Sequence, residues 1–341
     1  MGPPGGPRLV PPIPFSREES AVYQRILVPL GGSRFAEEAI PLALSILSRS
    51  GGSLSLATVA ALGSGYGGRE GGSARDDGVV QAERYMTAVE ERVRAAGFEG
   101  EVEWSVIPPG NIAASVVRHG REVDADLIVM TTHGRGPMRR AWLGSVADGV
   151  IRTSPFPVLL VRPPFDEEPT GGDNGEITVP ASDWGEAVAG PLFRNVLATL
   201  DGSQRSEVIL PLIPPLLEEG STVTLFQTVP PAAPGGYPYL PHSIREEKEQ
   251  KEVMEGTREY LKSRGSDLVA AGHEVEAVVG SSMHPGVAIL KKVRESGCDL
   301  IAMSTSGRGG VARLLLGSTA DKVIRGSGVP VLIHRDRRGE D

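Results

Sequence analysis

The sequence is poor in the residues that define several common protein classes. Its 341 residues include a single cysteine, Cys298, and aromatic residues make up only 5% of the chain. One cysteine cannot form a disulfide within the chain, which argues against an oxidised secreted framework. Because Cys298 directly precedes the apolar run "DLIAMS", we expect it to be a small buried residue and not a nucleophile.

Basic charge and long apolar runs are also missing. The formal net charge of −8 leaves no surplus of lysine and arginine to neutralise phosphates, so a general nucleic-acid binder is not expected. No run reaches the roughly 18 apolar residues that cross a bilayer, and the Pro/Gly-rich segment 1–21 lacks the apolar stretch of a signal peptide. We therefore expect a cytoplasmic protein without membrane contact, with disordered tails at 1–21 and 337–341.

The chain contains nearly the same segment twice. Residues 132–145 read "THGRGPMRRAWLGS" and residues 305–318 read "TSGRGGVARLLLGS". The beginnings align as well, because "RILVPLGGSRFAEEAIPLAL" at 25–44 pairs with "NVLATLDGSQRSEVILPLIP" at 195–214. An internal repeat of this length predicts two copies of one structural unit.

The repeat sets the predicted domain boundaries. We place the first domain at 22–164 and the second at 192–336, each long enough to bury its own core. Residues 165–191 are polar and rich in glycine and proline, which is typical of a linker. Within that linker we expect Trp184 to pack against a domain surface.

Within the first unit, apolar periodicity alternates between strand and helix. Strands are expected at 25–30, 53–60, 101–107, 126–131 and 157–161, and helices at 34–48, 79–97, 112–123 and from about 144 onward. Pro41 falls inside the first helical pattern and Pro211 matches it in the second unit, although an internal proline costs about 3 kcal/mol. Alternating strands and helices predict a parallel sheet with helices on both faces.

The repeated loop leaves the carboxyl end of the fourth predicted strand, the edge where parallel sheets bind ligands. Glycine lets the backbone approach a phosphate, and a helix start offers free N–H groups and partial positive charge. We expect Ser145 and Ser318 to cap the following helices and to donate hydroxyls to a phosphate. From the residues alone, a phosphate site and a ligand-free helix cap both remain open.

Neither catalysis nor metal binding has a clear signature. Arg135 and Arg308 are either phosphate clamps or solvated loop charges. Asp148 and Asp321, one turn into their helices, either reach a metal or lie on the helix surface. The sequence has no Walker-type, nucleophile-elbow or zinc-protease motif, so no catalytic residue and no protein metal ligand is predicted.

The two units resemble the universal stress protein family. "TLDGS" at 199–203 fits the family's first-strand ending, and Gly134 and Gly307 each precede a Gly-Ser pair by nine intervening residues. The resemblance covers both units and implies two tandem Rossmann-like α/β domains, each a five-stranded parallel sheet of order 3-2-1-4-5. Members usually pair through the fifth strand, so the resemblance implies an internal pseudo-dimer, to which a further homodimer can be added.

Resemblance to the ATP-binding branch of the family implies ATP, with or without Mg²⁺, at each loop. The glycines and serines would meet the phosphates and ribose, while Val59 and Val229 would flank the adenine. The implied contacts in the first unit are Leu30, Gly31, Val59, Met130, Thr131, Gly134, Arg135, Gly144, Ser145 and Val146. Those in the second unit are Leu200, Asp201, Val229, Met303, Ser304, Gly307, Arg308, Gly317, Ser318 and Thr319.

Two positions depart from the family pattern. Thr131 and Ser304 stand where the first glycine of the loop is expected, and a side chain there either crowds the phosphate or adds a hydrogen bond. The first-strand aspartate is Gly31 in the first unit but Asp201 in the second. The second site therefore looks more complete, and if only one site binds nucleotide we expect it to be the second.

The leading prediction for function is an ATP-binding protein that responds to nucleotide in stress or signalling. The alternatives are a slow ATPase or nucleotidyl- or phosphotransferase, and an interaction module whose sites no longer bind nucleotide. Fast catalysis is not expected, because no general base is evident. The long segments 62–78 and 230–250 are predicted to be loops on the ligand side, either lids or insertions.

Overall fold

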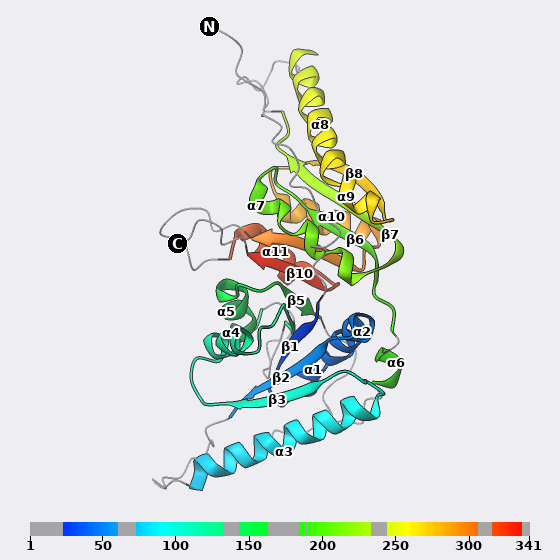
Figure 1. The fold of residues 1–341 in the computed structure, drawn as a ribbon. Coiled ribbons are helices and arrows are strands. Elements are labelled where there is room, and N and C mark those ends of the chain that lie inside the picture. Colours follow the sequence, from blue (N-terminus) through cyan, green and yellow to red (C-terminus); the bar gives the residue numbers. More distant parts are fainter. Residues whose placement is uncertain are drawn as a thin grey trace.

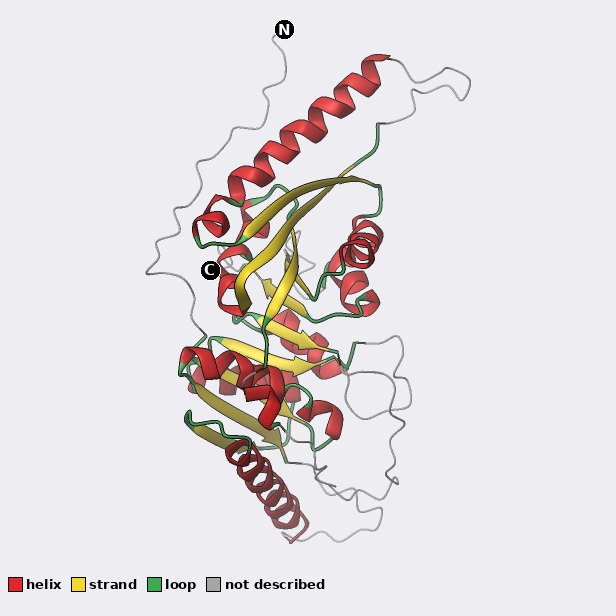
Figure 2. Ribbon diagram, turned by 90° about the vertical axis from the view of Figure 1, so that its right-hand side faces the viewer, coloured by secondary structure: helices red, strands yellow, loops and turns green. Residues whose placement is uncertain are grey.

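A single sheet runs through both halves of the chain. The structure is a computed structural model, and it describes residues 23–60, 73–132, 143–162, 184–188, 190–232, 244–305 and 316–335. Within these residues ten strands form one sheet (Figure 1), and helices cover both of its faces (Figure 2). The predicted tails, 1–21 and 337–341, lie outside the described residues.

Strands and helices alternate along the chain. The first half contains β1 (Arg25–Leu30), α1 (Arg34–Glu37), α2 (Ile40–Ser50), β2 (Ser53–Val59), α3 (Ser73–Ala95), β3 (Val102–Ile107), α4 (Ile112–Glu122), β4 (Leu127–Thr131), α5 (Ser145–Thr153) and β5 (Val158–Val161). The short helix α6 (Gly185–Val188) follows. The second half contains β6 (Phe193–Thr199), α7 (Gln204–Glu207), the 3-10 turns η1 (Leu210–Leu212) and η2 (Pro214–Leu216), β7 (Leu217–Val229), α8 (Ile244–Arg264), α9 (Ser266–Ala270), β8 (Glu274–Ser281), α10 (Pro285–Ser296), β9 (Leu300–Thr305), α11 (Ser318–Gly326) and β10 (Val331–Arg335).

The sheet order repeats from one half to the other. The strands lie in the order β3-β2-β1-β4-β5-β10-β9-β6-β7-β8, so each half has the order 3-2-1-4-5 with parallel neighbours. The predicted fold class, two Rossmann-like α/β units, is confirmed. Where the halves meet, β5 and β10 pair antiparallel, with Leu160 opposite Val331 and Leu159 opposite Leu332.

Two apolar cores lie on opposite faces of the sheet. Ile26 of β1 belongs to one core and its neighbour Leu27 to the other, because successive strand residues point to opposite faces. The first core packs α2, α3 and α8 through buried residues such as Leu44, Met86 and Leu261. The second packs α4, α5, α10 and α11. Burial on both faces explains why strands such as β4 read as continuous apolar runs.

The helix predicted over 34–48 is broken in two. α1 ends at Glu37 and α2 begins at Ile40, so Pro41 lies in the first turn of α2. Proline is well tolerated there, because a first-turn N–H has no partner within the helix. The prediction of a costly internal proline is therefore wrong. In the second half, Pro211 lies in the 3-10 turn η1 and Pro214 begins η2.

Two helices begin earlier than predicted. α3 starts at Ser73 and α8 at Ile244, inside the segments expected to be loops. The first turns of α8 read "REEKEQK", and these strong helix formers favour the helix. Residues 61–72 and 233–243 lie outside the described residues, so the lid stays a prediction. Although α3 and α8 are long, no helix in the described part of the chain is apolar enough to cross a membrane.

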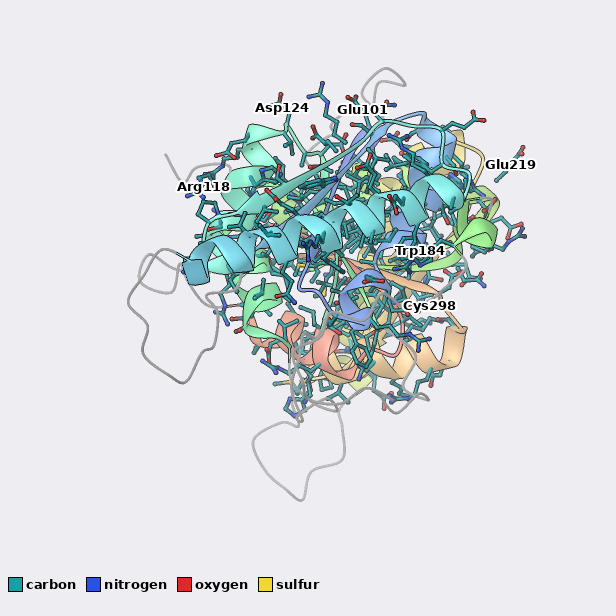
Figure 3. The ribbon with its side chains drawn as sticks, turned by 90° about the horizontal axis from the view of Figure 1, so that it is seen from below. Glu101, Arg118, Asp124, Trp184, Glu219 and Cys298 are labelled. Carbon is teal, nitrogen blue, oxygen red and sulfur yellow. The ribbon has the colours of Figure 1, made fainter. Side chains whose placement is uncertain are left out.

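A buried carboxylate fastens α1 to α3. Glu37 is only 2% exposed and accepts hydrogen bonds from the Tyr85 hydroxyl at 3.0 Å and the Arg92 guanidinium at 2.8 Å. Arg92 also lies 3.9 Å from the ring centroid of Trp184, which is buried beside α3 (Figure 3). The expectation that Trp184 packs against a domain is thus confirmed.

The second half repeats this arrangement on α7 and α8. Glu207 accepts a hydrogen bond from the Tyr260 hydroxyl at 2.8 Å and pairs with Arg264 at 3.1 Å. Burial, followed by the adjacent Glu207 carboxylate, raises the pKa of Tyr260 above its usual value. In both halves a carboxylate therefore ties the short helix after the first strand to the long helix after the second.

We predict that Glu37→Ala lowers the free energy of unfolding by about 3 kcal/mol, because it leaves the Arg92 charge, whose side chain is only 17% exposed, without its carboxylate. A matched control is Glu295→Ala, which breaks an exposed pair with Lys291 on α10 and should cost less than about 1 kcal/mol. Urea denaturation of both variants measures the difference. Similar losses in the two variants would contradict a stabilising role for the buried cluster.

Candidate functional site

The strand order reverses at β1 in the first half and at β6 in the second. β1 pairs with β2 on one side and β4 on the other, and β6 pairs in the same way with β7 and β9. In open parallel sheets, ligands bind outside the carboxyl ends of the strands at such a reversal. The predicted site residues that the structure describes lie at or next to the carboxyl ends of these strands.

A glycine occupies the cap position of the helix that starts at each reversal. Gly144 precedes α5 with φ −59° and ψ 146°, and Gly317 precedes α11 with φ −59° and ψ 143°. The Gly144 N–H donates to the Thr132 carbonyl at 2.8 Å, which fixes the start of α5 beside the end of β4. In neither helix does the N-cap residue itself supply a side-chain hydrogen bond. The N–H groups of a first helical turn carry partial positive charge and favour an anion.

Ser145 and Ser318 are the first residues of these helices, so the prediction that they form the caps is wrong. A capping side chain reaches the first-turn N–H groups only from a residue that is still extended, and here that residue is the preceding glycine. Both serines are exposed. Their hydroxyls lie at the helix starts, next to the first-turn N–H groups.

A tight turn follows the first strand of each half. Gly32 and Gly202 have φ of +67° and +82°, in the left-handed region that favours glycine. Ser33 and Ser203 come next and cap α1 and α7 with their side chains. The fold itself therefore requires this Gly-Ser pair, independently of any ligand.

The residue before this turn differs between the halves. Asp201 is exposed, and its Oδ1 accepts hydrogen bonds from the Ser203 N–H at 3.0 Å and the Ser203 hydroxyl at 2.5 Å. Gly31 has no side chain, and a Cβ placed there would meet no atom within 4 Å. The first half thus has room for the aspartate that it lacks, so the two sites differ in chemistry and not in space.

The remaining predicted site residues lie in the strands, at the helix starts or outside the described residues. Four apolar ones are at most 5% exposed at the ends of the strands: Leu30, Met130, Leu200 and Met303. Val59 and Val229 end β2 and β7, and Val146 and Thr319 are the second residues of α5 and α11. Thr131 and Ser304 lie within β4 and β9 and pair with Val161 and His334, so they belong to the sheet and not to the loop. Gly134, Arg135, Gly307 and Arg308 lie outside the described residues.

The helices α5 and α11 each contain an ion pair whose carboxylate lies in the first turn. Asp148 accepts two hydrogen bonds from Arg152, at 2.8 and 2.7 Å, and Asp321 accepts one from Arg325 at 2.8 Å. These contacts support the interpretation that both carboxylates lie along the helix surface. In the described part of the chain, no group of His, Cys, Asp and Glu side chains has the arrangement of a metal site.

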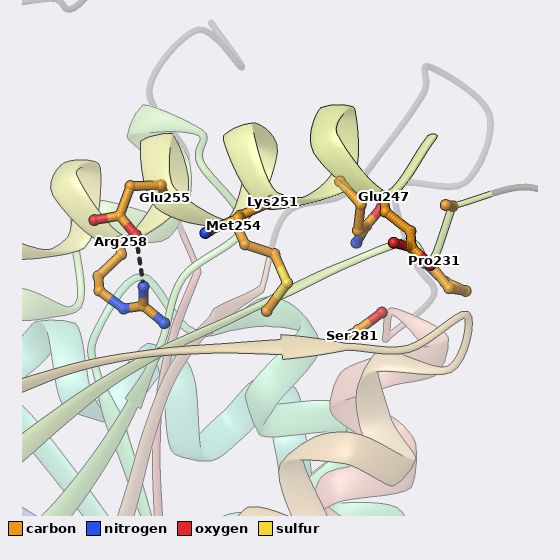
Figure 4. A pocket seen from close by; sticks show the side chains of 9 residues that line it. Pro231, Glu247, Lys251, Met254, Glu255, Arg258 and Ser281 are labelled. Carbon is orange, nitrogen blue, oxygen red and sulfur yellow. Dashed lines mark hydrogen bonds and ion pairs between the residues drawn. The ribbon is translucent and has the colours of Figure 1, made fainter. Parts of the chain in front are cut away.

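A pocket of about 540 Å³ lies between α8 and the ends of β7 and β8 (Figure 4). Its floor includes Pro231 and Ser281, and Met254 of α8 points into it. Its charged lining includes Glu255 and Arg258, which pair with each other at 2.8 Å. No sequence pattern predicts this pocket, because the charges of α8 have the pattern of a solvated helix face.

Cys298 is buried, as expected from the sequence. It is 6% exposed in the short segment between α10 and β9. Burial, with a smaller contribution from the neighbouring Asp299 carboxylate, raises the pKa of its thiol to about 11. A thiol in this state is a poor nucleophile, because only the thiolate reacts.

Taken together, the fold and the repeated helix starts define a tandem α/β protein with one candidate site at the strand-order reversal of each half. The sequence model of the universal stress protein family matches residues 22–162 and again residues 192–335. The chain therefore belongs to the universal stress protein family, in a tandem form.

Individual proteins and solved structures are similar to parts or most of this chain. A universal stress protein of Methanocaldococcus jannaschii is 28% identical over 151 residues, which span 44% of this chain and 89% of that protein. The crystal structure of a universal stress protein from Archaeoglobus fulgidus matches with a TM-score of 0.61 at 21% identity, covering 92% of this chain and 98% of that one. A solved universal stress protein in complex with cAMP covers 41% of this chain and 98% of its own, at 26% identity and a TM-score of 0.33. The bound cAMP is a property of that protein and is not carried over to this chain.

We predict that the Cys298 thiol of the folded chain reacts with iodoacetamide at pH 8 far more slowly than the unfolded chain does. With a pKa of about 11, roughly one thiol in a thousand is ionised at that pH, against about a quarter for an unperturbed cysteine. Mass spectrometry of samples labelled with and without urea measures both rates. Equal rates would show that the thiol is accessible and ionised in the folded protein.

Proposed function

We propose that this universal stress protein responds to nucleotide by binding ATP at the two helix starts, Gly144–Ser145 and Gly317–Ser318. The observation that carries the proposal is the repetition of one arrangement. In each half, a helix begins at a glycine that supplies no side-chain cap, after the strand that pairs with the one at which the sheet order reverses. A triphosphate is a ligand that such a helix start stabilises, through its N–H groups and its dipole.

The backbone at the second helix start is open to a ligand. Gly317 is exposed, and a Cβ placed on it would meet no atom within 4 Å. Phosphate or ribose oxygens can therefore approach this backbone closely. In the proposal the hydroxyls of Ser145 and Ser318 donate to these oxygens, and the glycines and arginines at 134, 135, 307 and 308 complete the two loops.

The adenine would lie toward the second strands. Val59 and Val229 end those strands and would flank the base, with buried Met130 and Met303 behind it. Any Mg²⁺ would arrive on the triphosphate, because Mg²⁺ is commonly held by substrate phosphates with few protein ligands. Asp148 and Asp321 pair with arginines of their own helices, which is consistent with a metal ion held by the phosphates and not by these carboxylates.

The organisation of the chain follows from the same proposal. The units that bind nucleotide are the domains 22–164 and 192–336, joined by the linker 165–191, and they act in the cytoplasm. The antiparallel contact of β5 with β10 supports an internal pseudo-dimer. Each site is then built from one half, and one chain carries two of them.

A second candidate function is favoured by the turn after the first strand. Because Gly32, Gly202 and the two capping serines serve the fold, their repetition does not by itself require a ligand. Gly31 moreover lacks the carboxylate that Asp201 supplies. An interaction module that keeps the fold without nucleotide is therefore the competing hypothesis.

The proposal predicts that ATP with Mg²⁺ binds the full chain with a stoichiometry of one or two, measured by isothermal titration calorimetry. ATP should also raise the thermal unfolding temperature, because a ligand that binds only the folded state stabilises it. Absence of both effects would favour the interaction module. Release of phosphate during a long incubation would instead identify a slow ATPase.

The Asp201→Ala variant should weaken ATP binding at the second site by about ten- to a hundredfold, the usual effect of losing a hydrogen bond to a charged group. Asp201→Asn keeps an oxygen to accept from Ser203 and thereby separates loss of charge from loss of the turn. Gly31→Asp should leave binding unchanged, and the open space at Gly31 makes it a clean comparison. Unchanged binding in Asp201→Ala, with altered binding in Gly31→Asp, would reverse the ranking of the two sites.

A further inference from the structure

One arginine from each half of the chain reaches a helix of the other half. Arg162, directly after β5, donates from Nη1 to the Ser327 carbonyl and, at 3.3 Å, to the Arg325 carbonyl at the end of α11. Arg335, the last residue of β10, donates from Nη1 to the Arg152 carbonyl at the end of α5, at 2.7 Å. The two contacts are equivalent across the β5–β10 pair.

These contacts use groups that a helix leaves unsatisfied. The last carbonyls of a helix have no partner within it and carry partial negative charge. A guanidinium can donate to such carbonyls and offset this charge, and Arg335 does so from a position that is only 8% exposed. The carboxyl-terminal ends of α5 and α11 are therefore each held by the opposite half.

Each arginine also adjoins the fourth strand of its own half. Arg335 pairs in register with Thr305, the last residue of β9. Arg162 follows Val161, whose carbonyl accepts a hydrogen bond from the Thr132 N–H at 3.1 Å, at the end of β4. Each arginine thus lies between the strand end of one candidate site and the helix of the other.

We propose that Arg335 is a positioning residue for the first site and Arg162 for the second, and that through them the two sites are coupled. This inference rests on the proposed function, because it concerns ATP at those sites. α5 and α11 have nine residues each and behave as short rods of about 13 Å. Fixing one end of such a rod determines where its other end, with the first-turn N–H groups, meets the phosphates.

The test isolates one site at a time. Ser318→Glu places a carboxylate at the start of α11, where it suits the helix dipole but repels a triphosphate, and leaves the first site working. Ser145→Glu does the reverse. Into each background we would introduce Arg335→Gln, Arg162→Gln or the control Arg118→Gln, an exposed arginine on α4. The dissociation constant for ATP with Mg²⁺ is then measured by calorimetry on the full chain.

We expect each arginine substitution to weaken ATP binding only at the site of the opposite half, which we call a crossed result. With the first site working, Arg335→Gln raises the dissociation constant roughly three- to tenfold while Arg162→Gln and Arg118→Gln leave it unchanged. With the second site working, Arg162→Gln has the effect and Arg335→Gln does not. Equal effects of both arginines in both backgrounds, or none, overturn the proposal, because general destabilisation of the interface would produce no such crossing.

A measurement without nucleotide separates this inference from the proposed function. Hydrogen exchange of the amides in α5 should accelerate in Arg335→Gln alone, and exchange in α11 in Arg162→Gln alone. If the unmodified chain binds no ATP, the proposed function fails, and crossed exchange still supports the positioning role of the arginines. If the chain binds ATP but exchange shows no crossing, the positioning role fails and the proposed function stands.

Discussion

The antiparallel pairing of β5 with β10 is the interaction on which the rest of the architecture depends. Each half alone would expose one of these strands as a sheet edge, with a row of unpaired N–H and C=O groups. Joining the two edges buries Leu159 and Leu332 completely and lets both apolar cores extend through both halves. The same pairing brings the residues after β5 and β10 beside helix ends of the opposite half, so the contacts of Arg162 and Arg335 follow from its geometry.

The direction of that pairing also separates the candidate sites. Because β5 and β10 run antiparallel while all other neighbours are parallel, the strands of one half point opposite to those of the other. Their carboxyl ends, where α5 and α11 begin, therefore open on opposite edges of the shared sheet. No single nucleotide can bridge them, and any communication between them has to pass through the protein. In the proposed coupling, the path runs along α5 and α11, whose carboxyl-terminal ends are contacted by Arg335 and Arg162 of the opposite half.

Much of the fold was open to prediction because it rests on local periodicity, and the repeat doubled the signal. Apolar runs and helical faces located the strands, and the spacing of Gly144 and Gly317 from the preceding glycines located both helix starts. The wrong predictions concern the exact residues at which helices begin, which the spacing of apolar residues does not determine. Pro41 lies in the first turn of α2, although the pattern predicted the interior of a helix there. The N-cap of α5 is Gly144 and not Ser145. The pocket under α8 and the cross-half arginines depend on contacts between residues far apart in sequence, which no window of the sequence contains.

The two halves have the same residue types in shielded clusters and different residue types at an exposed position. Glu37 and Glu207 each sit in a shielded cluster with a tyrosine and an arginine, where loss of any member leaves a buried charge or hydroxyl unsatisfied. Gly31 and Asp201 occupy the exposed position before the turn, where either residue fits the backbone. A duplicated fold can therefore keep one scaffold while its two ligand-facing edges diverge in charge. Any coupling through the shared helices would be reciprocal, so unequal sites would decide which edge binds first and not which edge acts on the other.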